Sequence, residues 1–205
     1  MVLSHVPLRG GEDGPYAALV AADQSAVWGP PGQADTLAVH IRFGIPEERL
    51  FTLDLTRTYS IALAERWLVH THRVDPRDFV RSPGTVRPAD AATREIEERT
   101  RTSGDRYQLL DAALNHTTLT CAILLKDTKS GTTLPYLVQV QWPDDGTGYH
   151  ITETPFRDEY SARRWMEHTE PPQDTDCLSP TVDRATAAAL PRAPTAAPSP
   201  PGAPV

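Results

Sequence analysis

Apolar and polar residues alternate along the first part of the chain. From Leu37 to Phe43, leucine, valine, isoleucine and phenylalanine occupy every second position. This period of two predicts a half-buried strand whose apolar side chains share one face, with alanine, histidine and arginine on the other. Phe51 to Leu55 resumes the alternation after a break, which predicts a hairpin partner. Ala17 to Ala22 predicts an earlier strand, and the glycines and prolines of residues 1–15 predict an unstructured lead.

The clearest alternation comes later in the chain. Apolar residues occupy every second position from Leu119 to Leu125 and again from Leu134 to Trp142. The segments that follow these two stretches carry aspartate and glycine, which are typical of turns. Tyr149 and Ile151 begin a third strand. Together these stretches predict an antiparallel meander with one apolar face.

Helical spacing separates the strands. Residues 61–70 place apolar side chains on one stripe, and Thr58 or Ser60 is the predicted cap of this helix. A closing helix is predicted after Asp158, which caps it. Between these two, Ala89 to Arg101 predicts a charged, solvent-exposed and lightly anchored helix. Arg106 to Asn115 predicts a shorter, apolar helix.

One stretch of the chain echoes another. The eight residues from Ala64 to Thr71 match Ala162 to Thr169 at five positions, including the scarce tryptophan and histidine. Strand patterns agree at nearly the same offset of 98 residues. The match suggests a duplicated strand–strand–helix unit, with chance similarity as the alternative interpretation.

These patterns predict the α+β class. We expect two antiparallel strand-meander-plus-helix units, which are duplicates under the repeat hypothesis, linked by two helices and followed by a disordered tail rich in proline and alanine. The predicted segments are a flexible lead at 1–15, a first unit at 16–72, a linker with the helical pair at 73–116, a second unit at 117–170 and the tail at 171–205.

The amino-acid composition limits the range of possible functions. The 205 residues carry a net charge of -7, which argues against nonspecific binding to nucleic acid. The helical pair at 89–115 leaves a DNA-associated regulator open as an alternative, although acidic residues outnumber its arginines.

The cysteines and the apolar runs bear on location. Cys121 lies in an apolar strand and Cys177 in the predicted tail, and neither has the spacing of a metal site or a disulfide framework. The N-terminus lacks the apolar core of a signal peptide, and the longest apolar run is too short to span a bilayer. These features predict a cytoplasmic protein without a membrane segment.

His70, His72 and Asp75 have side chains of the types that bind metals. They also lie at the end of a predicted helix, where histidines interact favourably with the helix dipole without any metal. We therefore predict no metal site and no cofactor.

Two His-x-Thr motifs suggest a catalytic alternative. They are His116 with Thr118, and His150 with Thr152. Paired motifs of this kind resemble those of the two-histidine phosphoesterases. In that family, two histidines on strands act as general acid and base, and hydroxyl groups help to hold the phosphate. The resemblance implies these roles for the four residues.

The favoured hypothesis is a non-enzymatic module for protein interaction or regulation. No nucleotide-binding, metalloprotease or serine-hydrolase motif occurs in the sequence. Small sheets offer edges and faces for pairing, and a flexible tail adds a further binding segment. The expected partner is an unidentified protein, and a homo-oligomer is an open alternative. The small phosphoester hydrolase and the DNA-associated regulator are the competing hypotheses.

Overall fold

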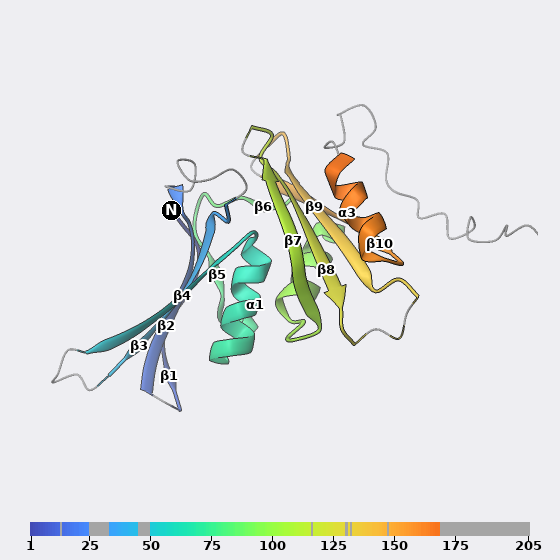
Figure 1. Cartoon of the computed structure of the whole chain (residues 1–205). Coiled ribbons are helices and arrows are strands. Elements are labelled where there is room, and N and C mark those ends of the chain that lie inside the picture. The colour runs from blue at the N-terminus through green and yellow to red at the C-terminus, as the bar shows by residue number, and fades with distance from the viewer. Residues whose placement is uncertain are drawn as a thin grey trace, which may run out of the picture. The chain divides into compact units, whose positions relative to one another are not determined.

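The computed structural model describes residues 1–12, 14–24, 33–44, 50–115, 117–129, 131, 133–146 and 148–168. These residues form an α+β fold of two five-stranded, mostly antiparallel sheets and three α-helices (Figure 1). The predicted fold class is therefore confirmed, whereas the duplication stays a hypothesis. The predicted disordered tail at 171–205 lies outside the described residues.

The first sheet, sheet A, contains the N-terminal residues. Its strands are β1 (Val2–Gly11), β2 (Gly14–Ala22), β3 (Thr36–Phe43), β4 (Phe51–Thr58) and β5 (Val80–Arg81), in the order β4-β3-β2-β1-β5. The prediction of an unstructured lead was wrong, because β1 pairs with β2 along most of its length. The glycines that suggested a loop form only its far end, where Gly14 has a φ of 105° at the turn into β2.

The buried face of β3 is the opposite of the predicted one. Thr36, Ala38 and His40 are buried, whereas Leu37 and Val39 are half-buried. A helix packs closely against the small side chains of this face, which include Ala18 and Ala38. Close approach of the helix, and not the size of the apolar side chains, therefore decides which face is covered.

Helix α1 (Ile61–His72) lies between the two sheets (Figure 1). Ser60 caps it, with its Oγ accepting a hydrogen bond of 3.3 Å from the Leu63 backbone N–H. Ile61 and Leu68 pack against sheet A, and Leu63 packs against the second sheet. Because both sides of the helix meet a sheet, its first five residues are all buried.

The second sheet, sheet B, is covered on both faces. Its strands are β6 (Arg87–Pro88), β7 (Tyr107–Asn115), β8 (Thr120–Asp127), β9 (Tyr136–Pro143) and β10 (Gly148–Phe156), in the order β6-β10-β9-β8-β7. Cys121 and Ile123 face the core that contains Leu63, whereas Ala122 and Leu124 belong to a core on the other face. The predicted meander is confirmed, but the prediction of a single apolar face was wrong.

The prediction of a helix over Arg106 to Asn115 was wrong, because strand β7 occupies this segment. Its pairing with β8 shifts register between Leu109 and Asp111. The bulge places Leu110 in the core on one face of the sheet and Leu114 in the core on the other. A bulge interrupts the alternation of side chains between the two faces of a strand. The apolar residues of this segment therefore have a spacing that resembles that of a helix.

Helix α2 (Ala91–Arg101) is anchored through polar side chains. Thr93, Glu97 and Thr100 are buried, which corrects the prediction of a lightly anchored helix. The Ile151 N–H donates to Thr93 Oγ1 at 3.0 Å, and Gln139 Nε2 donates to Thr100 Oγ1 at 3.0 Å. A short 3-10 helix (Pro76–Asp78) lies in the connection between α1 and β5.

A buried charged group joins α1, α2 and sheet A. This Glu65 cluster consists of Ser4, Glu65, Arg81, Glu97 and Arg101. Glu65 is fully buried, and its carboxylate accepts hydrogen bonds from Ser4 Oγ at 2.7 Å and from Arg101 Nε at 2.6 Å. Arg81 donates to Glu97. The cluster pairs two buried carboxylates with two arginines at the junction of three elements.

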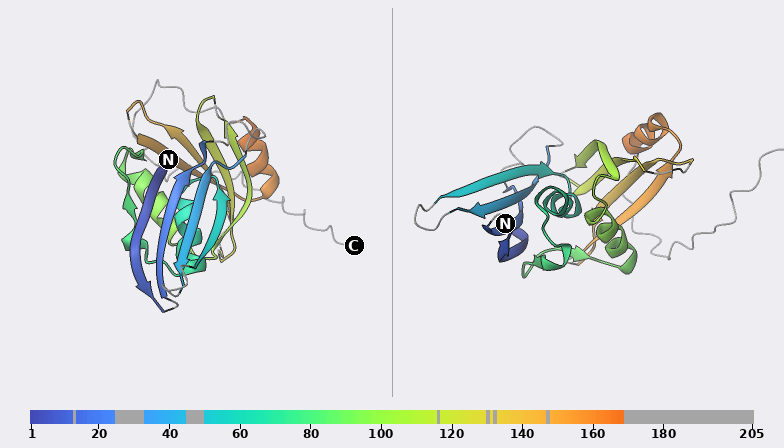
Figure 2. Two further views of the ribbon diagram at one scale, coloured as in Figure 1. Left: turned by 90° about the vertical axis from the view of Figure 1, so that its left-hand side faces the viewer. Right: turned by 90° about the horizontal axis from the view of Figure 1, so that it is seen from below.

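Helix α3 (Glu159–His168) covers the remaining face of sheet B through Ala162, which is fully buried. Asp158 caps it as predicted and accepts a hydrogen bond of 2.8 Å from the Ser161 N–H. The corresponding face of sheet A has no helix over it among the described residues (Figure 2). None of the described helices is long and apolar enough to cross a bilayer.

Candidate functional site

The uncovered face of sheet A is lined by apolar side chains in register. We call it the outer face. Its central row runs across all five strands through Leu55, Val39, Leu19, His5 and Val80, each directly opposite the next. This row points away from α1, because the neighbouring residues Ala18, Ala38 and His40 lie on the helix side. Figure 2 views the face with its strands in front.

Further rows extend the outer face toward the β3–β4 hairpin. Leu53 lies opposite Ile41, and Phe51 lies opposite Phe43. Phe51 is 64% exposed, Leu55 58%, Val80 49%, Leu53 46% and Phe43 39%. Because a large apolar side chain presents on the order of 200 Å², these five fractions together leave roughly 500 Å² of apolar surface, a size at which patches on monomers are often functional.

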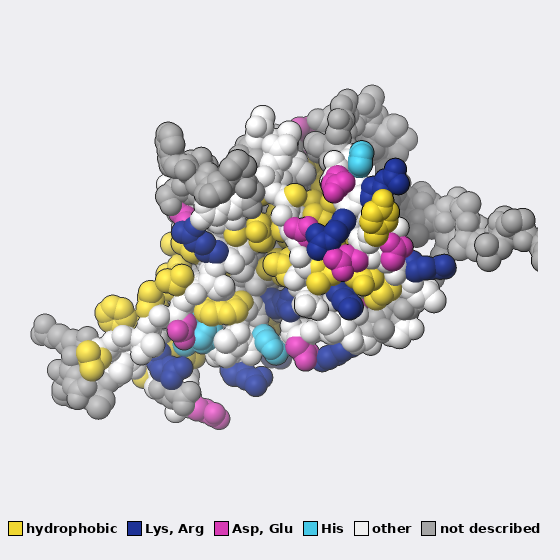
Figure 3. Space-filling view, viewed as in Figure 1, with side chains coloured by type: hydrophobic (Ala, Val, Ile, Leu, Met, Phe, Trp, Pro, Cys, Tyr) yellow, Lys and Arg dark blue, Asp and Glu magenta, His cyan; other side chains and the backbone are white. Residues whose placement is uncertain are grey.

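The outer face carries little charge. Among the described residues, the titratable side chains on its rows are His5 and Arg57, and Arg57 forms an ion pair of 2.7 Å with Asp23. Figure 3 shows hydrophobic side chains along the flank occupied by sheet A. In a chain with a net charge of -7, this face is close to neutral.

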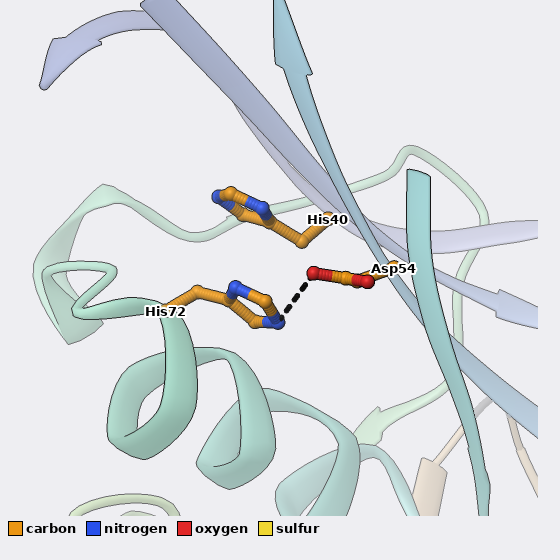
Figure 4. Close-up of side chains that lie close together, drawn as sticks. All are labelled: His40, Asp54 and His72. Carbon is orange, nitrogen blue, oxygen red and sulfur yellow. Dashed lines mark ion pairs between the residues drawn. The ribbon is translucent and has the colours of Figure 1, made fainter. Parts of the chain in front are cut away.

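A second site lies on the other side of the same sheet. We call it the His–Asp cluster: His40 on β3, Asp54 on β4 and His72 at the end of α1 (Figure 4). His40 and Asp54 are directly opposite each other in the β3–β4 pair. The two imidazole rings are stacked with centroids 4.1 Å apart, and His72 Nε2 lies 4.0 Å from Asp54 Oδ2.

Burial controls the charge of the two imidazoles. His40 is 5% exposed, and the side chain of His72 is 8% exposed. Burial lowers the pKa of His40, and the neighbouring His72 and Arg42 lower this pKa further. Burial also lowers the pKa of His72, against the opposing effect of Asp54. Both rings are therefore mainly neutral at pH 7.

The two histidines of the His–Asp cluster line a cavity of about 760 Å³. Its walls come from the β1–β2 turn, from β3 and from the last turn of α1, and they include Gly11, Tyr16, Arg42 and Arg73. Arg73 has a φ of 58° and ends the helix. His72 Nε2 is buried and has no hydrogen-bond partner among the described residues.

The residues of the hydrolase hypothesis are only partly described. His116 lies outside the described residues, and Thr118 is exposed in the turn before β8. His150 lies on β10, with Nδ1 3.0 Å from Asp90 Oδ2 and Nε2 3.5 Å from Asp144 Oδ1. Thr152 is exposed two residues further along the strand. The pairing of the two motifs stays a prediction.

The DNA-associated alternative loses part of its structural basis. The second helix of the predicted pair is strand β7. Arginines of this region are engaged by carboxylates: Arg99 by Glu153, and Arg106 by Asp127.

Cys121 is a buried thiol. Its Sγ lies 3.4 Å from the Tyr59 carbonyl oxygen as a hydrogen-bond donor, and burial raises its pKa to about 12. The group is therefore protonated at neutral pH and is a poor nucleophile.

Of the three residues in the His–Asp cluster, only His72 is a candidate in the sequence analysis, where it is grouped with residues that are not its neighbours in the structure. His72 was considered with His70 and Asp75, but both of these are exposed, and Asp75 instead caps the short 3-10 helix. His40 and Asp54 were missed. His40 and Asp54 lie at equal distances in sequence from the centre of the predicted hairpin, and residues placed in this way pair across its two strands. The predicted register therefore indicates that these two side chains are neighbours.

Comparisons with known proteins give no relative. No family model, no curated protein and no solved structure matches this chain.

Proposed function

We propose that this chain is a non-enzymatic protein-interaction module that binds through the outer face of sheet A. The observation that carries the proposal is the in-register row from Leu55 to Val80, which no described element covers. Sheet B buries both of its faces, one of them beneath α3. Sheet A lacks this cover among the residues that the structure describes, and a binding partner supplies it.

The proposed occupant is a second copy of the same chain. Two outer faces meet without placing like charges against each other, because His5 and the paired Arg57 are the titratable groups on these rows. A two-fold interface uses the same patch on both copies. The apolar area of roughly 500 Å² forms the centre of such an interface, and the rim completes the ~800 Å² per partner of a stable dimer.

The arrangement that fits is face-to-face packing of two sheets. Sheets that stack in this way lie ~10 Å apart, with side chains of both inner faces interdigitating. Leu55, Val39 and Leu19 would then form the centre of the contact. Phe43 and Phe51, next to the hairpin, would lie toward its edge.

Sedimentation equilibrium over a wide concentration range tests the proposal. The wild-type chain is expected to form dimers. Leu55→Gln is expected to raise the dimer dissociation constant roughly tenfold or more, because each dimer loses apolar contact area twice. The matched control is Leu119→Gln, since Leu119 is 64% exposed but lies in the turn before β8.

Two outcomes would contradict this proposal. One is a wild-type chain that stays monomeric at every concentration, which removes the second copy as occupant. The other is a dimer that Leu55→Gln and Leu119→Gln weaken equally, which places the interface elsewhere. Circular dichroism of both variants confirms that each is folded before the comparison is made.

A further inference from the structure

We propose that His40, Asp54 and His72 bind a divalent transition-metal ion, with Zn²⁺ as the probe. One ligand atom from each residue can be chosen so that all three lie within 4.8 Å of one another. They come from β3, β4 and the end of α1, and Figure 4 shows them converging on one region. The site is independent of the outer face, because it lies on the helix side of sheet A.

The buried nitrogen of His72 is the observation that points to a ligand. Only 8% of the His72 side chain is exposed, and yet its Nε2 lacks a hydrogen-bond partner among the described residues. A buried polar atom without a partner costs about 1–3 kcal/mol, so such atoms are rare unless something binds them. In this cluster the atom faces Asp54 Oδ2 at 4.0 Å, a distance that leaves the hydrogen bond unmade.

The protonation states suit metal binding. A metal takes the lone pair of a neutral imidazole, and burial already holds both rings in that form at pH 7. Asp54 supplies the negative charge that offsets part of the charge of the ion. The nearby Arg42 acts against binding, because its positive charge reaches both histidines. We therefore expect the site to bind a metal ion less tightly than it would without this neighbouring arginine.

Closing the site around an ion requires one imidazole to rotate out of the stacked arrangement, because the nitrogen lone pairs of two nearly parallel rings lie in parallel planes. Bonds of about 2.0–2.2 Å to zinc require the ligand atoms to lie closer together than they do here. Asp54 has the freedom to move, since its side chain is 53% exposed. His72 ends α1, so its ring can shift without disturbing a following helical turn.

The ligand set selects the class of metal. Two imidazoles and one carboxylate suit Zn²⁺ and other first-row transition ions, whereas Ca²⁺ and Mg²⁺ require mostly oxygen ligands. Three protein ligands leave at least one coordination position open. Here the two histidines line the cavity of about 760 Å³, where water or a small anion has room.

Isothermal titration with Zn²⁺ tests this proposal on the untagged full chain after treatment with a chelator. Wild type is expected to bind one ion per chain, and His72→Gln and Asp54→Asn are each expected to weaken binding at least roughly tenfold. Asp54→Asn is expected to fold normally, because that side chain is half exposed. A loss of binding in this variant therefore reports on the site and not on a folding defect. A Zn²⁺-induced rise in melting temperature should disappear in the same variants.

His150→Gln is the matched control. His150 also lies between two carboxylates, but Asp90 meets Nδ1 and Asp144 meets Nε2. These atoms are on opposite sides of the ring and cannot hold one ion together. Unchanged binding in this control, with loss in the other variants, supports the proposal. No binding by wild type, or equal binding by wild type and Asp54→Asn, overturns it.

Discussion

Asp90 illustrates how a single side chain ties a helix to a sheet. It caps α2 by accepting a hydrogen bond of 2.6 Å from the Thr93 N–H, and its other oxygen lies 3.0 Å from His150 Nδ1. The hydrogen bond from Thr93 is the main cause that lowers the pKa of Asp90 below its usual value. The negative charge at the start of the helix is thus favoured in the folded chain.

This lowered pKa predicts a pH dependence. A carboxyl group whose pKa is lower in the folded state stabilises the fold above its unfolded pKa, and this contribution disappears as the pH falls through the folded pKa. Asp90→Asn keeps a capping side chain but removes the charge. We expect it to lower the free energy of unfolding by about 0.5 kcal/mol at pH 7, since the carboxylate is partly exposed.

Urea denaturation at several pH values provides the measurement. The difference between wild type and Asp90→Asn should shrink toward zero between pH 5 and the acid limit of folding. A difference that stays constant with pH would show that the charge of Asp90 does not contribute.

Residue-scale features of the candidate sites were only partly accessible from the sequence. The opposition of His40 and Asp54 follows from the register of a hairpin that the alternation predicts. The position of His72 beside these two residues does not follow from the register, because it depends on the direction in which α1 crosses sheet A. The choice of the face of β3 that α1 covers is likewise a tertiary effect, and it placed His40 inside and Val39 outside.

At the scale of elements, the Glu65 cluster connects α1 and α2. Glu65 is fully buried and accepts from both Ser4 and Arg101. Glu65→Ala would leave the arginines without a full set of partners, and losing one side of a buried ion pair typically costs 3–5 kcal/mol. We therefore expect Glu65→Ala to lower the free energy of unfolding by about 3 kcal/mol or more.

Glu98→Ala serves as the control for this effect. Glu98 also pairs with Arg101, but its side chain is 54% exposed. An exposed pair contributes ~0–1 kcal/mol, so this variant should remain close to wild type. Chemical denaturation of both variants measures the difference, and similar losses would contradict the special role of burial.

Elements with regular periodicity were predictable, and those with interrupted periodicity were not. Strands β3, β4, β8, β9 and β10 and helices α1 and α3 occupy the segments in which the sequence predicts them. Strand β7 was mistaken for a helix because its bulge near Leu110 breaks the period of two. Strand β1 was missed because its glycines at positions 10 and 11 dominate the local composition, although Leu3 and Val6 are buried.

At the scale of the whole molecule, α1 belongs to the cores of both sheets. Leu68 packs with the core of sheet A, and Leu63 packs with the core of sheet B. Loss of either sheet would expose one side of this helix. We therefore expect the folded region to unfold in one cooperative transition.

Two fluorescence probes can test this cooperativity. Trp67 reports on the core of sheet A, and Trp165 reports on the core beneath α3. In each variant that retains only one of these tryptophans, with the others replaced by phenylalanine, the fluorescence transition should coincide with the transition seen by far-ultraviolet circular dichroism. A fluorescence transition that departs from the circular-dichroism transition of the same variant would indicate that the sheets unfold independently.

Strand β4 has a consequence for handling the protein. It ends sheet A, and its sequence from Phe51 to Thr58 has two charged residues, Asp54 and Arg57, but neither proline nor lysine. Proline and lysine are the residues that most commonly protect an exposed edge from pairing with the strands of neighbouring molecules. Newly synthesised chains that crowd together during overexpression would meet at this edge before their proper contacts form. Slow expression at low temperature should therefore give less inclusion-body material than rapid expression.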